Sequence, residues 1–351
     1  MSDQISLPEF VEPCRYCNGE GQTEQTYTRG CGMGYSREMG SCPMCGKHER
    51  YGRPGPGFVY KATGEPVGKS AVAQIETMRS PMAETSAIEW TDATVNFWWG
   101  CTKVGPGCDH CYAETWANRF GMKLWAAAAP RRPIEGAAAM LRKLDRGHER
   151  FISEHGRRRR VFMQSMSDLF DNAVDPHLRR AALDEAECAT RLDIIFLTKR
   201  VSNVASMIPD RWMADGWPRH IGMMITVVNQ QEANRDIPRL LHLKRWLGIP
   251  WVGLSIEPML DHIDLTPWLA HIDWVIAGGE SGHEARRMQA SWLRALRDQC
   301  KGSHIPFFFK QWGDYYPTSG DSSTGLPRSG KKAADRLLDR RTHDEFWRIP
   351  G

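Results

Sequence analysis

Short runs of apolar residues recur along the chain from Ile88 onward, and longer amphipathic stretches separate most of them. A short apolar run without polar alternation is typical of a strand that is buried on both faces, as in a parallel sheet. The strands that this pattern predicts are residues 95–99, 160–166, 193–197, 221–227, 251–256, 272–277 and 305–309. Helical periodicity occupies several of the gaps, at residues 177–189, 231–243 and 291–301.

Strands that alternate with helices predict an α/β fold. Polar residues recur where the predicted strands end, and barrel enzymes build their active sites at that rim. We therefore expect a complete or partial (β/α) barrel, in preference to an open doubly wound sheet.

The first 57 residues differ from this pattern because they are rich in glycine and cysteine. Two Cys-x2-Cys knuckles can supply the four thiolates of a tetrahedral zinc site, which predicts a zinc-ribbon-like module at residues 1–57. This module is either a structural unit or a docking site for nucleic acid or another protein. Cys31 is either a substitute ligand or a bystander. The predicted zinc ligands are Cys14, Cys17, Cys42 and Cys45.

The segment that follows is rich in Gly, Pro, Ser and Ala, and we expect residues 58–87 to be a linker. Residues 88–351 then form the barrel and a C-terminal extension.

The composition of the 351 residues is ordinary for a globular protein, with 41% hydrophobic and 25% charged residues. A formal net charge of +4 does not by itself require a nucleic-acid partner, although residues 157–160 are four consecutive arginines. The sequence has no apolar stretch of about 20 residues and no signal-peptide pattern at its start. We therefore expect a cytoplasmic protein, in which clustered cysteines favour metal binding over disulfides.

A second group of cysteines follows the first predicted strand, in a Gly/Pro-containing loop. Cys101, Cys108 and Cys111 are close in sequence, and a helix is predicted to begin after the last of them. Structural zinc and closed four-iron clusters normally take four protein ligands, so three thiolates favour an iron–sulfur cluster with one open iron. His110 and Tyr112 flank the last cysteine, where they can shield a cluster, contact a ligand ring or pack the helix start. Alternatively, His110 or another cysteine completes a zinc site.

Polar residues lie at the carboxyl ends of the later predicted strands. A charge at the end of a buried strand is costly unless it is paired or binds a ligand, so a ring of charges predicts a polar substrate or cofactor. The alternatives are structural: Asp168 can cap a turn, Lys199 can pair with Glu257 or Glu280, and the glycines can make only a tight turn. The candidates are Ser167, Asp168, Lys199, Glu257, Gly278, Gly279, Glu280 and Lys310.

With its cysteines after the first strand, the chain resembles a radical S-adenosylmethionine enzyme. It is most similar to a phage and prophage family with the motif Cys-x6-Cys-x2-Cys. The matching landmarks span about Ile88 to Arg341. They are Ile-Glu-Trp-Thr-Asp at 88–92, the cysteine motif at 100–113, Ser-Met-Ser-Asp-Leu-Phe at 165–170, Leu-Thr-Lys-Arg at 197–200, Glu-Pro at 257–258, Gly-Gly-Glu-Ser-Gly at 278–282 and Phe-Phe-Lys-Gln-Trp-Gly at 308–313.

The resemblance implies a barrel of the radical S-adenosylmethionine type, in which Cys101, Cys108 and Cys111 hold a [4Fe-4S] cluster. The open iron would bind S-adenosylmethionine, and one-electron reduction would yield a 5′-deoxyadenosyl radical that abstracts hydrogen from a substrate. By the same resemblance, the catalytic candidates are Asp168, Lys199, Glu257 and Lys310. The cofactor-binding candidates are His110, Tyr112, Ser167, Gly278, Gly279 and Glu280.

Two features depart from the usual superfamily pattern. The first two cysteines usually enclose three residues, whereas Cys101 and Cys108 enclose six. The loop must therefore fold back, which Gly105 and Gly107 allow. Gly-Gly-Glu usually follows the second strand, but here it follows the sixth predicted strand.

The phage association and the fourteen tryptophans lead us to expect modification or isomerisation of a DNA base or nucleotide, with an external electron donor. Two alternatives remain. One is a repair lyase of the same chemistry that reverses a DNA lesion, and the other is a nonenzymatic zinc-binding adaptor for nucleic acid.

Overall fold

The computed structural model describes residues 11–13, 58–60, 82–315 and 336–347. The chain divides into two compact units, Met1–Ser80 and Pro81–Gly351. In the first unit, β1 (Val11–Pro13) pairs antiparallel with β2 (Phe58–Tyr60). The predicted domain limits stay a prediction, and so does the zinc site. Its four ligands and Cys31, namely Cys14, Cys17, Cys31, Cys42 and Cys45, lie outside the described residues.

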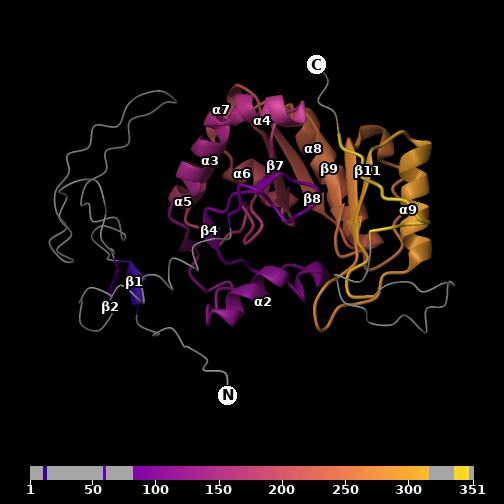
Figure 1. The fold of residues 1–351 in the computed structure, drawn as a ribbon, viewed down its shortest axis with the longest axis horizontal. Coiled ribbons are helices and arrows are strands. Elements are labelled where there is room, and N and C mark those ends of the chain that lie inside the picture. Colours follow the sequence, from indigo (N-terminus) through magenta and orange to yellow (C-terminus); the bar gives the residue numbers. More distant parts are fainter. Residues whose placement is uncertain (1–10, 14–57, 61–81, 316–335, 348–351) are drawn as a thin grey trace. The chain divides into compact units, whose positions relative to one another are not determined.

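The second unit is built on a curled sheet of seven parallel strands, with helices on its outer side (Figure 1). The strands lie in the order β11-β10-β9-β8-β7-β6-β3, so each later strand adds to the same side of the sheet. β3 and β11 are its two edges, which confirms the partial barrel. The strands are β3 (Ala93–Thr94), β6 (Arg160–Met163), β7 (Asp193–Thr198), β8 (Ile221–Thr226), β9 (Val252–Ile256), β10 (Trp274–Gly278) and β11 (Phe307–Gln311).

The three predicted helices are present as α5, α8 and α9, and capping residues explain their limits. Asp175 accepts a hydrogen bond from the backbone N of His177 at the start of α5, and Asn229 caps α8. Gly248 ends α8 with a φ of +68°, a conformation that favours glycine. The helices are α2 (Tyr112–Arg119), α3 (Ala137–Arg146), α4 (His148–His155), α5 (Pro176–Cys188), α6 (Val204–Met207), α7 (Asp210–Ala214), α8 (Gln230–Leu247) and α9 (Ala290–Gly302).

None of the helices in the described part of the chain combines the length and the apolarity that crossing a bilayer requires.

The prediction of one strand at residues 95–99 is wrong. β3 ends at Thr94, and β4 (Trp98–Trp99) pairs antiparallel with β5 (Arg132–Pro133) in a separate two-stranded sheet. The chain leaves the main sheet because hydrogen bonds with side chains take the place of the backbone hydrogen bonds that would continue the strand. Asn96 bonds to the backbone N of Met166, and Gln164 Oε1 accepts from the backbone N of Phe97 at 2.9 Å. Apolar periodicity does not reveal such substitutions.

Side chains of the parallel strands alternate between two apolar cores. One core lies on the helix side, and the other is a smaller aromatic cluster on the inner face of the half-barrel, around Trp90, Phe162, Trp251 and Trp274. Gly222 makes room for this cluster, because a Cβ at that position would lie 1.8 Å from the Trp251 ring. We name this aromatic cluster the floor.

Residues near the C-terminus complete the floor. The segment runs beside the edge strand β11, where the backbone N of Phe309 donates to the carbonyl of His343 at 2.9 Å. Trp347 then stacks on Trp251, with ring centroids 4.1 Å apart, and contacts Trp274 at 4.7 Å. The segment therefore covers an exposed sheet edge and closes one end of the half-barrel.

Trp347→Ala should lower the free energy of unfolding by about 3–5 kcal/mol, because it opens a cavity in the floor. Trp246→Ala is the matched control, since Trp246 is 54% exposed. Its effect should stay within about 0.5 kcal/mol. Urea unfolding of both variants measures the difference, and equal effects would contradict a packing role for Trp347.

Candidate functional site

A pocket of about 400 Å³ opens where the parallel strands end. This volume lies within the usual range for small-molecule sites. Its lining includes every described candidate except Gly278. The candidates that the structure brings together there are Cys101, Cys108, His110, Cys111, Tyr112, Ser167, Asp168, Lys199, Glu257, Gly279, Glu280 and Lys310.

The long loop between the first two cysteines folds back over the strand ends. It contains a 3₁₀ turn, η1 (Pro106–Cys108), in which the backbone N of Cys108 donates to the carbonyl of Gly105 at 2.9 Å. Gly107 lies close to the end of β8, because a Cβ there would lie 2.7 Å from Val228. Cys111 then precedes helix α2 as its N-cap residue. The glycines thus let three cysteines face one pocket.

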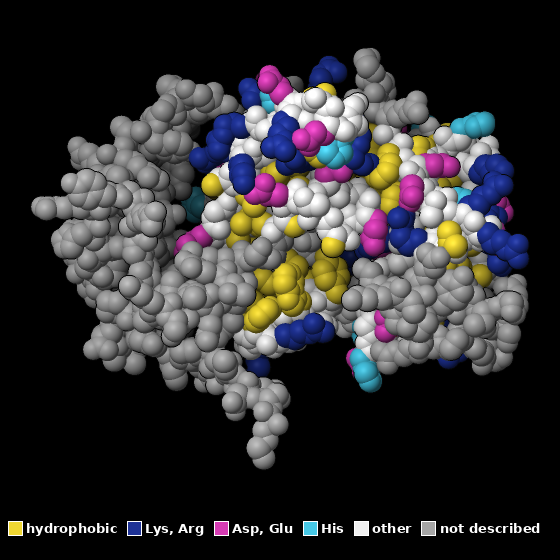
Figure 2. Space-filling view, viewed as in Figure 1, with side chains coloured by type: hydrophobic (Ala, Val, Ile, Leu, Met, Phe, Trp, Pro, Cys, Tyr) yellow, Lys and Arg dark blue, Asp and Glu magenta, His cyan; other side chains and the backbone are white. Residues whose placement is uncertain are grey.

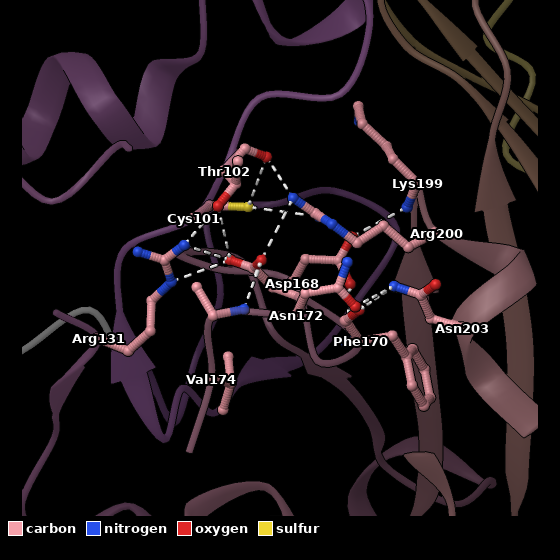
Figure 3. A network of polar contacts seen from close by, with 12 residues as sticks. Cys101, Thr102, Arg131, Asp168, Phe170, Asn172, Val174, Lys199, Arg200 and Asn203 are labelled. Carbon is pink, nitrogen blue, oxygen red and sulfur yellow. Dashed lines mark hydrogen bonds and ion pairs between the residues drawn. The ribbon is translucent and has the colours of Figure 1, made fainter. Parts of the chain in front are cut away.

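Cys101 lies in a buried, charged surrounding (Figure 3). Arg200 Nη1 donates to its sulfur at 3.6 Å and to Asp168 Oδ2 at 2.8 Å. Burial raises the pKa of the thiol to about 12; Asp168 adds to this effect and Arg200 opposes it. Since metals bind the thiolate, a metal that binds here must displace a proton.

Both oxygens of the Asp168 carboxylate accept hydrogen bonds from protein donors. Oδ1 accepts from Thr198 Oγ1 at 2.8 Å and from the backbone N of Phe170 at 2.9 Å. Oδ2 accepts from the backbone N of Lys199 at 3.0 Å and from Arg200. The structure thus agrees with the alternative in which Asp168 caps a turn, and a catalytic role for it stays a prediction.

A second buried ion pair continues this network below Thr102. Arg131 Nη2 lies 2.6 Å from Asp171 Oδ2 and donates to Thr102 Oγ1 at 2.6 Å. Arg200 contacts the other Asp171 oxygen at 3.7 Å and also donates to the carbonyl of Thr102. Figure 3 shows Arg131 and Arg200 converging on the Cys101 segment from opposite sides. Sequence reasoning missed Arg131 and Asp171 as site residues, whereas Arg200 belongs to the landmark at 197–200 at a strand end but was assigned no role.

The lysines of the pocket differ in their partners. Lys310 Nζ lies 3.1 Å from Glu257 Oε1, so Glu257 pairs with Lys310 and not with Lys199. Lys199 forms no ion pair with any described carboxylate, and its side chain points away from the Asp168 network (Figure 3). Its charge lowers the pKa of Cys111, whereas burial, the larger effect, raises it.

Several buried polar atoms of the pocket have no hydrogen-bond partner among the described residues. A buried donor or acceptor without a partner costs about 1–3 kcal/mol. Four such atoms belong to residues that line the pocket. They are Gln164 Nε2, Thr226 Oγ1, Glu257 Oε1, which faces Lys310 without hydrogen-bond geometry, and Gln311 Oε1.

Glu280 is held by protein groups at the mouth of the pocket. His110 Nδ1 lies 3.1 Å from Oε2, and Arg286 donates to both carboxylate oxygens. Burial acts to raise the pKa of Glu280, but the hydrogen bonds from Arg286 and His110 outweigh it and hold the pKa below its usual value.

The two preceding glycines permit close packing of the chain. A Cβ on Gly279 would lie 1.9 Å from the carbonyl oxygen of Trp312, and a Cβ on Gly278 would lie 2.7 Å from Glu257 Oε1. Gly278 lies outside the pocket lining and packs closely against the end of the Glu257 side chain.

Two further candidates take part in local hydrogen bonds. Tyr112 is 55% exposed, and its hydroxyl donates to the carbonyl of Ser165 at 2.7 Å. Ser167 donates to Gln164 Oε1 at 2.9 Å.

Among the described residues, no three His, Cys, Asp or Glu side chains converge tightly enough to hold a single metal ion. A four-iron cluster makes a different demand, because each thiolate binds its own iron and the sulfurs surround the cluster. The spread of Cys101, Cys108 and Cys111 around one pocket is compatible with that arrangement.

The arginine run at residues 157–160 is used in local contacts. Arg157 forms two hydrogen bonds with Asp92, at 2.6 and 2.8 Å, and Arg158 pairs with Asp193 at 2.8 Å. Arg160 lies over the Phe346 ring. Positive and negative side chains are also interspersed over the helices on the face in Figure 2. The run is therefore a set of structural contacts.

Comparison with known proteins links the sequence to one family. The profile of the family described as "Protein of unknown function (DUF5131)" matches residues 85–347. No curated protein matches the sequence.

Similar solved structures include variants of spore photoproduct lyase. One, with bound AdoMet and dinucleoside spore photoproduct, is 15% identical with a TM-score of 0.33; the match covers 60% of this chain and 61% of that chain. Another is 12% identical with a TM-score of 0.39 and covers 65% and 78%. The chain thus spans about 61% of the length of the first.

Asp171→Asn should lower the free energy of unfolding by about 3–5 kcal/mol, because it leaves the charge of Arg131 buried without its partner. Asp215→Asn makes the same chemical change at an exposed position and should have an effect within about 0.5 kcal/mol. Urea unfolding tests both variants. A small effect at Asp171 would mean that the network contributes little to stability.

Proposed function

The chain belongs to the family described as Protein of unknown function (DUF5131), and we propose that it is a radical S-adenosylmethionine enzyme. One observation carries the proposal. Three cysteines line the same pocket as four residues that each have a buried polar atom without a hydrogen-bond partner among the described residues, at the carboxyl ends of a parallel half-barrel. This arrangement offers ligands for a cluster and hydrogen-bonding groups for a bound molecule beside it.

The donor set fits a [4Fe-4S] cluster with one open iron. The pocket lining contains three cysteines, Cys101, Cys108 and Cys111, and each would bind one iron. A cluster held by these cysteines would supply the one-electron reduction of S-adenosylmethionine and thus radical chemistry that removes hydrogen from a substrate. Arg200 supports the cluster ligands by donating to the sulfur of Cys101.

The chain's other pocket residues bind and orient the reactants. The Lys199 ammonium attracts an anionic group, such as a carboxylate or a phosphate. Gln164 and Gln311 offer an unused donor and an unused acceptor. Glu257 and Lys310 act as a charged pair in the same pocket. His110, Tyr112, Ser167 and Gly279 are the remaining proposed cofactor contacts, whereas Gly278 lies outside the pocket lining and the Glu280 oxygens are taken by Arg286 and His110.

The proposed substrate is a DNA base or nucleotide, which the enzyme modifies or isomerises. The aromatic side chains of Trp90 and Phe162 line the pocket together with the unused polar atoms. Flat apolar surfaces beside hydrogen-bonding groups are what recognition of an extruded base requires. Reversal of a base lesion uses the same recognition, and turnover on damaged DNA without modification of intact DNA would identify it.

Three parts of the proposal rest on the sequence. They are a zinc site in residues 1–57, an external electron donor, and the origin of this protein in a phage or prophage, with its action in the bacterial cytoplasm.

Anaerobic reconstitution with iron and sulfide should give the broad visible absorbance of an iron–sulfur cluster, and single alanine variants of Cys101, Cys108 and Cys111 should lose it. Cys300→Ala is the control, because Cys300 is buried in the core of α9, away from the pocket. Incubation with S-adenosylmethionine and a reductant should then release 5′-deoxyadenosine. A colourless protein that binds only zinc would overturn the proposal and favour a zinc-binding adaptor.

Lys199→Met should weaken the binding of S-adenosylmethionine or of a nucleotide at least about tenfold, because a charge-assisted hydrogen bond contributes about 1.5–3 kcal/mol. Lys123→Met is the control, since Lys123 is exposed and outside this pocket. Equilibrium binding to the cluster-loaded protein measures both ligands. Unchanged affinity for both would exclude Lys199 from binding.

A further inference from the structure

The loop that carries Cys108 crosses the mouth of the half-barrel and meets the segment after β10. Its close contacts with the first turn of α8 and with the segment after β8 are made at glycines. A Cβ on Gly105 would lie 2.7 Å from Glu232 Oε1, and Gly107 approaches Val228 equally closely. Within the loop, the backbone N of Cys108 donates to the carbonyl of Gly105 and the backbone N of Asp109 donates to the carbonyl of Pro106, and each bond makes a single turn. Lys103 Nζ adds one side-chain hydrogen bond inside the loop, to the carbonyl of Asp109 at 3.2 Å.

Arg286 supplies a side-chain anchor from the other side of the mouth. Its Nη2 donates to the carbonyl of Pro106 at 2.7 Å, and its Nη1 lies 3.1 Å from Asp109 Oδ2. Pro106 and Asp109 lie on either side of Cys108 in the sequence. The Arg286 guanidinium therefore binds both sides of the turn that contains this cysteine. Its planar donors can bond to the Pro106 carbonyl and the Asp109 carboxylate at once.

Glu280 in turn holds Arg286 in place. Its two oxygens accept from Arg286 Nη2 at 2.6 Å, Nε at 2.9 Å and the backbone N at 2.8 Å. The Glu280 side chain is 5% exposed. His110, next to Cys111 in the same loop, lies 3.1 Å from Oε2. Exposed ion pairs contribute little, but a buried carboxylate with several aligned donors has a defined geometry.

We propose that Arg286 and Glu280 are positioning residues that clasp the long cysteine loop and thereby hold Cys108 at the cluster site. The proposal rests on the proposed function, because it takes Cys108 as a cluster ligand. Glu280 then acts through the loop, since both of its oxygens are taken by protein donors. The clasp also offsets the conformational freedom that the unusual spacing of the motif gives to the loop. A loop with six residues between its first two cysteines has more conformational freedom than one with three, and the clasp restricts it.

The order of the loop can be measured without a cluster. In the metal-free full-length chain, Arg286→Gln should speed amide hydrogen exchange at Cys108 and Asp109 at least about tenfold, because the turn loses its charge-assisted anchor. Arg287→Gln is the matched control: it removes the same charge from the next residue, whose guanidinium lies over the Tyr315 ring. Equal exchange in the two variants would overturn the clasp.

Cluster retention tests positioning. After anaerobic reconstitution, Arg286→Gln should lose bound iron to a chelator at least about tenfold faster than wild type and Arg287→Gln. Arg286→Lys keeps a positive charge beside Glu280 but cannot donate to Pro106 and Asp109 with one planar group. Its rate of iron loss should lie between those of wild type and Arg286→Gln. Unchanged iron loss in Arg286→Gln would overturn the role in positioning Cys108.

Hydrogen exchange and iron loss together distinguish a failure of the clasp from a failure of the proposed function. If wild type binds no cluster, the radical chemistry fails and with it the role of the clasp in presenting a ligand, while hydrogen exchange still reports whether Arg286 orders the loop. If wild type binds a cluster and Arg286→Gln resembles it in both measurements, only the clasp is overturned.

Discussion

The candidate site depends on charges that must neutralise one another beneath Cys101. Arg131, Asp171, Arg200 and Asp168 alternate in sign along one buried network. Any one of them left alone would carry a large desolvation cost, so the four are stable only as a set. Arg131 lies just before β5, the two aspartates follow β6, and Arg200 follows β7, so the network ties these segments together under the cysteine. Because the partners are all protein groups, Cys101 is held in place before any ligand binds.

The strands themselves create the chamber by a change of residue type along one face. Side chains two positions apart in a strand share a face. On β6, Phe162 belongs to the floor, and Gln164, just after the strand, faces the pocket. On β8, Met224 belongs to the floor and Thr226 lines the pocket. On both strands, the inward-facing side chain that follows the floor residue two positions later is polar. The pocket begins at these polar side chains.

The elements that sequence predicted best are those set by local hydrophobic pattern. The six later strands and the three predicted helices depend on apolar runs and caps, which are local signals. The first strand failed because Asn96 and Gln164 bond to backbone groups that a ladder would otherwise use. The candidate pocket residues could be gathered because parallel strands all end at one rim. Their partners could not, since Arg131, Arg200 and Arg286 reach their acceptors through long side chains whose direction no sequence pattern encodes.

The position of Trp347 has a consequence for the order in which the molecule can be completed. A chain made from its N-terminus can add parallel strands one after another, since each pairs mainly with a neighbour already present. The floor is different, because Trp251 and Trp274 receive Trp347 only after all seven strands have been synthesised. Until then the apolar inner face is open to water. A residue that follows all seven strands therefore seals the half-barrel, and until it is made the nascent chain has an exposed aromatic surface that the folded unit does not.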